Sequence, residues 1–266
     1  MMELPKRIGR SVLPSSLNTV LGDLICHPWV GRRIGRVFRE RVPARGVVIA
    51  TDSEVVNDRT KAQIFWGIYE SAEIRFVKGH LRSDLDVVEL GSSLGVVSSH
   101  IAIALKPEAR LVCVEANPEL IPIIKANTLA NAAGAKVTIL QRAIDYDPGR
   151  RQVLLQVSDN TAASRVSPES VSVADSVEVP TARLADVLKA QEIGRYALVA
   201  DIEGAEAGIL LNDAEALESC EQIIIELHDT HYEGREYCYG DLAEMIQNRH
   251  GFRAEAQHGP VYAFSR

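Results

Sequence analysis

The sequence lacks the cysteine spacing that a structural zinc site or a disulfide framework requires. Its four cysteines, Cys26, Cys113, Cys220 and Cys238, are scattered, and no C-x-x-C pair occurs. Cys113 and Cys220 lie in or beside apolar runs, where a thiol usually serves as a small core residue. This usage excludes the disulfide-stapled and zinc-finger classes and predicts a protein of the reducing cytoplasm.

Long apolar runs and positive charge are also missing. No uninterrupted apolar run reaches about 18 residues, the length of a membrane-spanning helix, so the sequence predicts no transmembrane segment. Pro14, Asn18 and Asp23 interrupt the apolar stretch near the N-terminus, which argues against a signal peptide. The formal net charge is −7 at pH 7, so the chain as a whole does not have the charge of a nucleic-acid binder.

One stretch departs from this acidic balance, the segment "GRRIGRVFRERVPAR" over residues 31–45. One interpretation is a solvated helical face. The alternative is a surface that docks an acidic partner or an anionic membrane. The segment sets six arginines against Glu40: Arg32, Arg33, Arg36, Arg39, Arg41 and Arg45.

Short apolar runs alternate with helical patterns from Leu85 onward in a chain that is 46% apolar and 24% charged. This alternation predicts an α/β fold with a doubly wound, mostly parallel sheet and helices on both faces. The last two runs predict an antiparallel pair over 252–257 and 261–266, so the C-terminal strand reverses direction. Strands are predicted over 86–90, 110–115, 136–140, 196–202 and 221–229, and helices over 95–105, 118–133, 181–191, 206–212 and 239–250.

The chain divides into two predicted parts. Residues 1–80 form an N-terminal extension packed on the core, with a β-hairpin over 46–56 and helical turns over 59–81. Residues 81–266 form the main domain. An insertion near 150–180 interrupts it, with antiparallel strands around a Ser-rich polar loop on the ligand face.

A nucleotide-binding signal follows the first core strand, in "VVELGSSLGVVSS" (87–99). Gly91 and Gly95 let the backbone turn sharply and approach a ligand, with Ser93 between them. The third glycine of the dinucleotide fingerprint is missing, and Glu89 would repel a pyrophosphate. Glu89 suits an ammonium group instead, such as the amino-acid end of S-adenosylmethionine. Glu115 ends the second strand, where an acid can accept the ribose hydroxyls.

The sequence at this point resembles the FkbM family of S-adenosylmethionine-dependent methyltransferases, which belong to class I. The resemblance spans roughly residues 64–230, and "DIEGAE" (201–206) is its most specific part. It implies a class I methyltransferase fold for residues 81–266, S-adenosylmethionine as cofactor and O-methylation of sugar or polyketide hydroxyls. The segments that carry it, in order, are "VVELGSSLGVVSS", "CVEANPEL", "KANTLANAAG", "QRAID" and "DIEGAE".

Two departures from the family pattern stand out. The family often has Asp-x-Gly-Ala-Asn where this chain has the residues from Glu89 to Ser93. In the family, a lysine is common two residues before the aspartate of the motif that reads "DIEGAE" here, and this chain has Val199 at that position. No role of that lysine can therefore be carried over.

Three carboxylates crowd the stretch "VADIEGAEAGILL" (199–211). Asp201 follows a buried strand that should lie beside the glycine-loop strand, so we predict that it contacts the cofactor near its methyl group and is catalytic. Glu203 would point the same way if the strand continued. Glu206 starts a helix, where an acid is stabilised without any functional role.

The next strand ends in a second polar cluster, "IIIELHDTHY" (223–232). His228 is predicted as the general base because its unperturbed pKa lies near neutrality, and Glu226 as a further catalytic residue. The alternative for His228 is a loop histidine with only a hydrogen bond. Four side chains could instead hold a divalent metal such as Mg²⁺: Asp201, Glu203, Glu226 and His228.

Further cofactor contacts are predicted from the family resemblance. Its N-terminal segment tends to cover the cofactor, which makes Glu70 a candidate. Ala116 follows the ribose-binding acid. The third strand ends where class I methyltransferases contact adenine, which makes candidates of Gln141, Arg142 and Ala143.

The favoured hypothesis is an S-adenosylmethionine-dependent O-methyltransferase acting on a small molecule or glycan, with a sugar favoured by the Ser-rich loop over 158–175. One alternative is an NAD-dependent oxidoreductase on the same kind of sheet. Another is a non-catalytic scaffold that uses the arginine-rich segment. The sequence leaves both the acceptor and the oligomeric state open, a homo-oligomer among the alternatives.

Overall fold

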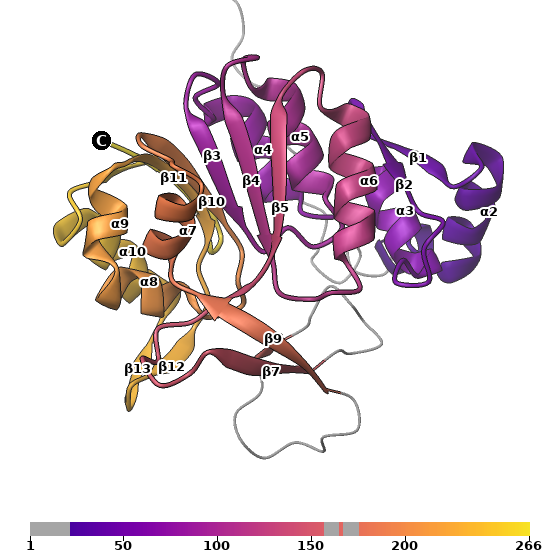
Figure 1. Cartoon of the computed structure of the whole chain (residues 1–266). Coiled ribbons are helices and arrows are strands. Elements are labelled where there is room, and N and C mark those ends of the chain that lie inside the picture. The colour runs from indigo at the N-terminus through magenta and orange to yellow at the C-terminus, as the bar shows by residue number, and fades with distance from the viewer. Residues whose placement is uncertain (1–21, 157–164, 167–175) are drawn as a thin grey trace, which may run out of the picture.

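The computed structural model describes residues 22–156, 165–166 and 176–266. A seven-stranded sheet forms its centre, in the order β14-β15-β11-β10-β3-β4-β5 (Figure 1). Neighbouring strands are parallel from β5 to β11, and β15 runs antiparallel to both of its neighbours. This confirms the predicted α/β fold with a mostly parallel sheet. The strands are β3 (Asp86–Leu90), β4 (Arg110–Glu115), β5 (Lys136–Gln141), β10 (Tyr196–Ala200), β11 (Cys220–Glu226), β14 (Arg253–His258) and β15 (Val261–Ser265).

The order of the strands reverses at the middle of the sheet. The chain runs outward from β3 through β4 to β5, then returns so that β10 pairs with the other side of β3. Such a switch point leaves a crevice at the carboxyl ends of the two central strands, which is where open α/β sheets bind ligands.

Helices cover both faces of the sheet because side chains alternate along each strand. Val87 and Val199 face one hydrophobic cluster, and Val88 and Leu198 face the other. The first cluster includes α4 (Ser71–His80), α5 (Val96–Ala104) and α6 (Ile121–Asn131), and the second α7 (Leu184–Ala190), α8 (Glu206–Asn212), α9 (Ala214–Glu218) and α10 (Tyr239–Asn248) (Figure 1).

The N-terminal elements are α2 (Pro28–Phe38), β1 (Arg41–Ala44), β2 (Val47–Ala50) and α3 (Asp58–Trp66). Strands β1 and β2 form an antiparallel hairpin. The hairpin predicted over 46–56 was therefore placed too far along the chain, since it includes β2 but not β1. Val42 and Ala44 are the buried residues of β1. Arginines flank this short segment, so the alternation of apolar and polar residues that predicts a strand is not apparent in the sequence. The hairpin is pinned to the main domain by α6, because Asn127 and Asn131 each accept a hydrogen bond from a β2 backbone N–H.

A second, smaller sheet forms in the region predicted as an insertion. Its strands are β6 (Ala143–Ile144), β7 (Gln152–Gln156), β8 (Arg165–Val166) and β9 (Ser176–Ala182), and β7 pairs antiparallel with β9 as expected. Apart from Arg165–Val166, the loop over 158–175 lies outside the described residues, so its role in shaping the acceptor pocket stays a prediction.

Several boundaries differ from those predicted. Helix α6 begins at Ile121, so Pro118 lies in the preceding turn and Pro122 in the first helical turn. Helix α7 begins only at Leu184, because β9 continues through Ala182. A hairpin of β12 (Thr230–Tyr232) and β13 (Arg235–Tyr237) was not predicted.

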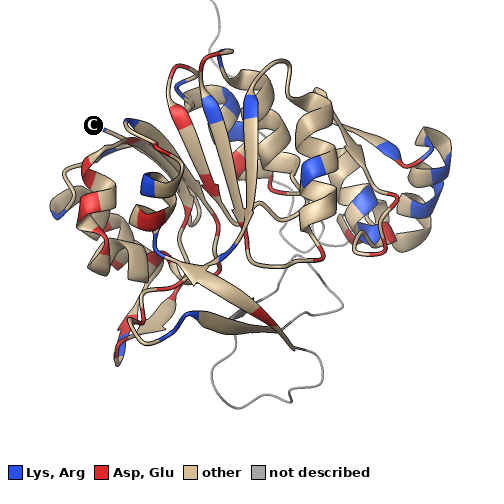
Figure 2. Cartoon of the chain, in the orientation of Figure 1, with Lys and Arg blue, Asp and Glu red and all other residues tan. Residues whose placement is uncertain are grey.

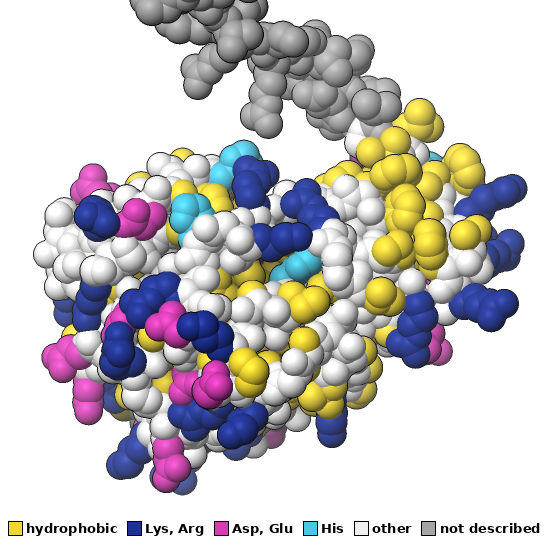
Figure 3. All heavy atoms as spheres, turned by 90° about the horizontal axis from the view of Figure 1, so that it is seen from above, with side chains coloured by type: hydrophobic (Ala, Val, Ile, Leu, Met, Phe, Trp, Pro, Cys, Tyr) yellow, Lys and Arg dark blue, Asp and Glu magenta, His cyan; other side chains and the backbone are white. Residues whose placement is uncertain are grey.

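Lys and Arg gather on α2, at the end of the molecule away from the C-terminus (Figure 2). Arg32 pairs with Asp58 at 3.0 Å, whereas Arg33 and Arg36 are exposed, as a solvated helical face would require. Hydrophobic side chains also gather on the surface at this end of the molecule (Figure 3). Trp29 of α2 and Trp66 of α3 are exposed. Docking of an acidic partner here stays a prediction.

None of the helices in the described ranges has both the length and the apolar character needed to cross a bilayer.

Candidate functional site

The site begins where β3 and β10 end side by side. The Asp201 N–H donates to the Leu90 carbonyl at 3.0 Å, and the Gly91 N–H donates to the Val114 carbonyl of β4 at 2.9 Å. Gly91 has a φ of +81°, and a Cβ there would lie 1.7 Å from the Asp201 carbonyl oxygen. Only glycine fits this position, because both the backbone conformation and the contact exclude a side chain.

Glu89 is the penultimate residue of β3 and is buried, with 2% of its surface exposed. One carboxylate oxygen accepts hydrogen bonds from the hydroxyls of Ser92 and Ser98. The other, Oε1, is buried without a hydrogen-bond partner among the residues that the structure describes. Burial raises the pKa of Glu89 to about 6, although hydrogen bonds from Ser98, Cys113 and Ser92 oppose the rise. A positively charged ligand would supply the missing partner.

Hydrogen bonds from neighbouring segments shape the glycine loop. Glu115 accepts the Ser93 N–H at 2.9 Å and the Asn117 N–H at 2.8 Å, so one carboxylate at the end of β4 orders the loops that follow β3 and β4. The Ser93 hydroxyl also hydrogen-bonds the Tyr69 hydroxyl at 2.8 Å. The loop is therefore tied both to the predicted ribose-binding acid and to the segment before α4.

A small cavity of about 10 Å³ lies between these elements, and its charged lining is acidic. Glu70, Glu73, Glu89 and Asp201 all face it. Glu70 Oε2 is buried and, within the described ranges, has no hydrogen-bond partner. Burial, followed by the charges of Asp201, Glu73 and Glu89, raises the pKa of Glu70 well above its usual value. The structure thus places the predicted cofactor residues Glu70, Glu89 and Asp201 around one cavity.

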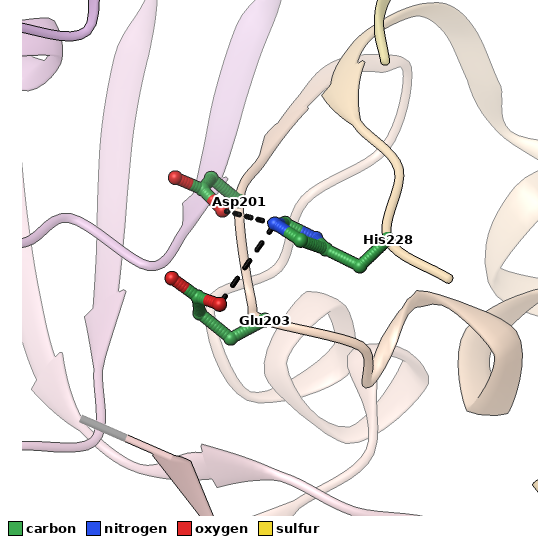
Figure 4. Close-up of side chains that lie close together, drawn as sticks. All are labelled: Asp201, Glu203 and His228. Carbon is green, nitrogen blue, oxygen red and sulfur yellow. Dashed lines mark ion pairs between the residues drawn. The ribbon is translucent and has the colours of Figure 1, made fainter. Parts of the chain in front are cut away.

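Asp201, which lines this cavity, lies close to Glu203 and His228 (Figure 4). The His228 Nε2 atom lies 3.8 Å from Asp201 Oδ1 and 3.9 Å from Glu203 Oε2. Strand β10 ends at Ala200, so Glu203 does not reach this point by strand alternation as expected. A turn with a left-handed Glu203, φ +53°, brings it there instead.

Glu206 holds His228 in place from behind. It is fully buried, and its Oε1 atom lies 3.1 Å from His228 Nδ1 and accepts the Ile202 N–H at 3.2 Å. Because a carboxylate accepts, Nδ1 carries the donated proton and Nε2 faces Asp201 and Glu203. The interpretation of Glu206 as only a helix-start acid is therefore incomplete.

The carboxyl groups around His228 favour its protonated form, whereas the predicted general base requires the neutral form. Partial burial by itself lowers the pKa of His228, but the hydrogen bond and charge of Glu206 and the charges of Asp201 and Glu203 outweigh it and raise the pKa to about 9. Burial raises the pKa of Asp201 to about 7, against the opposing charge of His228. A protonated His228 could not accept a proton, which favours Asp201 over His228 as the candidate general base.

Glu226 ends β11 and meets Glu73 of α4, a residue that the sequence did not single out. Burial and a hydrogen bond between the two carboxyl groups raise the pKa of Glu226. Glu226 Oε1 lies 4.0 Å from His228 Nε2. One sequence signal could have pointed to Glu73: an acid placed among the apolar residues of "SAEIRFV", on the face of α4 that is buried.

The predicted adenine-side residues lie at the end of β5 and beyond it. Gln141 is half-buried and pairs in register with Glu115. Arg142 is exposed, and its guanidinium donates to the Gln141 carbonyl at 2.7 Å. Ala143 is buried in a small cluster with Val153, and Ala116 packs against that cluster. The Ala143 side chain therefore fills a core and leaves only its backbone for a ligand.

Val199 occupies the place where related sequences often carry a lysine. Its side chain is buried, lies beside Glu89 in the β10–β3 register, and lines the acidic cavity. The cavity wall is apolar at this position.

Comparison with known sequences identifies one family. The sequence profile described as "Methyltransferase FkbM domain" matches residues 91–254, more than half of the chain. No curated protein is significantly similar to the chain over its sequence.

Solved methyltransferase structures are similar at low identity. The ribosomal protein L11 methylase of Lactobacillus delbrueckii subsp. bulgaricus is 15% identical, with 73% of this chain and 76% of that chain covered and a TM-score of 0.41. Aeropyrum pernix fibrillarin, solved with natively bound S-adenosyl-L-methionine, is 11% identical, with 75% of each chain covered and a TM-score of 0.43.

Proposed function

Because the chain belongs to the FkbM methyltransferase family, we propose that it transfers the methyl group of S-adenosylmethionine to a hydroxyl oxygen of a small molecule or glycan. The single observation that carries the site of this reaction is the buried Glu89 Oε1, which has no hydrogen-bond partner within the described residues and lies beside a glycine loop at the switch point of the sheet. S-adenosylmethionine brings both an ammonium and a sulfonium, which suits a cavity lined by carboxylates.

The cofactor is held at both ends in this proposal. Glu89 binds its ammonium group, and Gly91 lets the backbone approach it closely. Glu115 accepts the ribose hydroxyls with the lone pairs that its loop hydrogen bonds leave free. Ala116 and Gln141 lie on the way to the adenine. Glu70 and Asp201, which line the same cavity, would then face the sulfonium and its methyl group.

The transfer itself is a displacement at carbon. The acceptor oxygen attacks the methyl carbon in line with the breaking carbon–sulfur bond, and the electron pair of that bond stays on sulfur. Orientation of the two reactants supplies much of the rate. Asp201 takes the hydroxyl proton, while the His228 imidazolium, fixed by Glu206, holds the Asp201 carboxylate in position.

Isothermal titration of the purified protein with S-adenosylmethionine tests the assignment. We expect saturable binding in the micromolar range, release of S-adenosylhomocysteine in the presence of a hydroxylated acceptor, and no comparable binding of NADH, because Glu89 would repel the pyrophosphate. Tight NADH binding would favour the oxidoreductase hypothesis. Absence of S-adenosylmethionine binding at millimolar concentration would contradict the proposal, and binding without turnover on any acceptor would favour a scaffold.

A divalent cation is a second candidate ligand, and the residues present fit it. Asp201, Glu203 and His228 each offer one ligand atom, and these atoms lie within 4.8 Å of one another. Glu206 hydrogen-bonds the distal nitrogen of His228, which is how metal-binding histidines are commonly oriented. Glu226, the fourth predicted ligand, lies outside this group of three. A bound Mg²⁺ would lower the pKa of the acceptor hydroxyl.

Removal of metal distinguishes activation of the acceptor hydroxyl by a bound cation from proton removal by Asp201 alone. If a cation acts here, EDTA-treated protein should lose transfer activity by at least about 10-fold, and Mg²⁺ or Mn²⁺ should restore it. His228→Ala should abolish the response to metal while leaving S-adenosylmethionine affinity within about twofold, measured by titration. Full activity in EDTA would contradict the metal site and leave Asp201 as the group that takes the proton.

A further inference from the structure

Both tryptophans of the chain lie on the surface of its N-terminal elements. The sequence contains two, Trp29 of α2 and Trp66 of α3. Their side chains are 55% and 48% exposed, although tryptophan is highly buried on average. Trp66 lies next to the start of α2, since its Nε1–H donates to the Ile25 carbonyl at 3.1 Å. Large apolar side chains that gather on a surface indicate contact with a partner.

The outer face of α2 mixes apolar and basic side chains. Trp29, Arg33 and Arg36 are spaced i, i+4 and i+7, so they share one face of the helix. Arg32 and Val37 flank them on either side. All five are exposed, and Val37 is 74% exposed. We call these five residues the basic face.

The basic face is fixed in place by the packing behind it. Gly31, Ile34 and Gly35 are the buried residues of α2. A Cβ at Gly31 would overlap the carbonyl oxygen of Asp58, so glycine is what lets α2 pack directly on the start of α3. The helix is therefore already folded and oriented, and docking through it costs little ordering entropy.

Most of the positive charge on the basic face is not neutralised. Arg32 pairs with Asp58 at 3.0 Å. Arg33 and Arg36, in contrast, make no side-chain ion pair or hydrogen bond with any residue in the described ranges. Two guanidinium groups are thus available to a negatively charged partner beside an exposed indole.

The charge of the chain is divided in the same sense. Residues 22–66 contain eight lysines and arginines against five acids, whereas residues 67–266 contain 18 against 30. A negatively charged surface would attract the first part and repel the second. It would therefore orient the molecule with α2 toward it, and α2 lies at one end of the molecule (Figure 2).

Two observations favour a membrane over a protein as the negative partner. Apolar and basic side chains are interspersed along the basic face, whereas a protein interface usually has an apolar centre and a polar rim. The interface of an anionic bilayer accepts both kinds of side chain at one depth, guanidinium groups at the phosphates and apolar groups at the acyl boundary. The position of α2 at one end also suits contact with a flat surface (Figure 1).

We propose that the basic face, together with Trp66, docks the protein on the surface of an anionic membrane. Arg33 and Arg36 contact lipid phosphates, and Trp29 and Val37 insert between the headgroups. Helix α2 lies in the plane of the interface. This docking surface is separate from the acidic cavity, and it does not depend on the proposed methyl transfer.

Vesicle sedimentation with the full chain tests the proposal. We expect vesicles of phosphatidylcholine with about 30% phosphatidylglycerol to bind at least about 20-fold more tightly than pure phosphatidylcholine, because each arginine at the surface contributes roughly fivefold. Arg33→Gln combined with Arg36→Gln should weaken anionic binding by at least about 10-fold. The fluorescence of the two tryptophans should shift to shorter wavelength on binding, and salt should reverse both effects.

Matched variants separate charge from apolar contact and from loss of folding. Arg33→Lys combined with Arg36→Lys keeps the charge and should bind within about threefold of the wild type. Trp29→Ser should weaken anionic binding by at least about fivefold. Arg75→Gln combined with Arg151→Gln removes two exposed charges outside the N-terminal elements and should have no effect. Every variant should keep the wild-type melting temperature, because all the substituted side chains are exposed.

Three results would overturn the docking surface. One is equal binding of the two kinds of vesicle by the wild type, including no detectable binding of either. Another is anionic binding that survives the loss of both Arg33 and Arg36. The third is binding of poly-L-glutamate as tight as that of anionic vesicles and unchanged in Trp29→Ser, which would identify an acidic protein as the partner. A protein that binds S-adenosylmethionine but no vesicle contradicts only the docking surface.

Discussion

Glu89→Gln is expected to weaken S-adenosylmethionine binding by roughly 30-fold or more while making the cofactor-free protein more stable. Binding falls because the variant replaces a buried carboxylate opposite the cofactor ammonium with a neutral amide, and loss of one partner of such a pair costs about 2–5 kcal/mol. Stability rises because the wild-type carboxylate is buried with one oxygen that has no described partner.

The gain in stability should depend on pH in a defined direction. The pKa of Glu89 is raised from 4.5 to about 6 in the folded protein, so the folded state binds this proton more tightly than the unfolded chain does. The stabilisation that the proton provides is complete below about pH 4.5 and is lost as the pH rises through about 6. Above that pH the variant should be more stable by about 2 kcal/mol, which is several degrees in melting temperature.

Calorimetric melting between pH 5 and 8 and titration with the cofactor measure the two effects. Glu108→Gln is the control, because Glu108 is exposed at the opposite end of the sheet, next to the start of β4. A Glu89→Gln protein that melts below the wild type at pH 8, or that binds the cofactor normally, would contradict the role given to Glu89.

Asp201→Asn should reduce the rate of methyl transfer by about 10²–10⁴-fold, with cofactor affinity changed by no more than about threefold. Asparagine keeps the size of the side chain and the backbone hydrogen bond to Leu90, but it cannot take the hydroxyl proton. The loss should appear in kcat, since the acceptor pocket is unaltered in shape.

The pH profile of the wild type gives an independent check on Asp201. Burial raises the pKa of Asp201 to about 7, so its basic form is lost as the pH falls through this value and the wild-type rate should fall with it. The residual rate of Asp201→Asn should not show this dependence. Asp229→Asn is the matched control, because Asp229 follows the next strand and accepts the exposed Tyr239 N–H, a contact that asparagine can keep. Single-turnover rates that are equal in wild type and Asp201→Asn would exclude Asp201 as the base.

The sequence was sufficient to predict the parts of the site that strand order determines. Glu89, Gly91, Glu115 and Asp201 each follow from a short motif at a strand end, and parallel strands bring their carboxyl ends to one edge. The sheet with its reversed C-terminal strand follows from the same alternation. Local sequence patterns were enough because the strand-end residues and the topology of the sheet depend on the order and direction of strands and helices. They depend very little on how side chains pack.

The protonation of the site could not be predicted in this way. The pKa of His228 depends on Glu206, which reaches it only because a left-handed turn at Glu203 redirects the chain after Ala200. The contact between Glu73 and Glu226 depends on how α4 packs against the end of β11, and these residues lie far apart in the sequence. Such contacts are properties of packing, and a single sequence contains no local signal for them.

The position of β10 between β3 and β11 also governs when the site can form as the chain folds. The pairing of Asp86 with Tyr196 joins residues about 110 positions apart, and closure of so long a loop is entropically costly and slow. The residues proposed to hold the cofactor come from both sides of this closure, Glu89 and Glu115 before it and Asp201 after it. Cofactor binding therefore contributes little to early folding, and its full stabilisation is gained only once β10 has docked against β3.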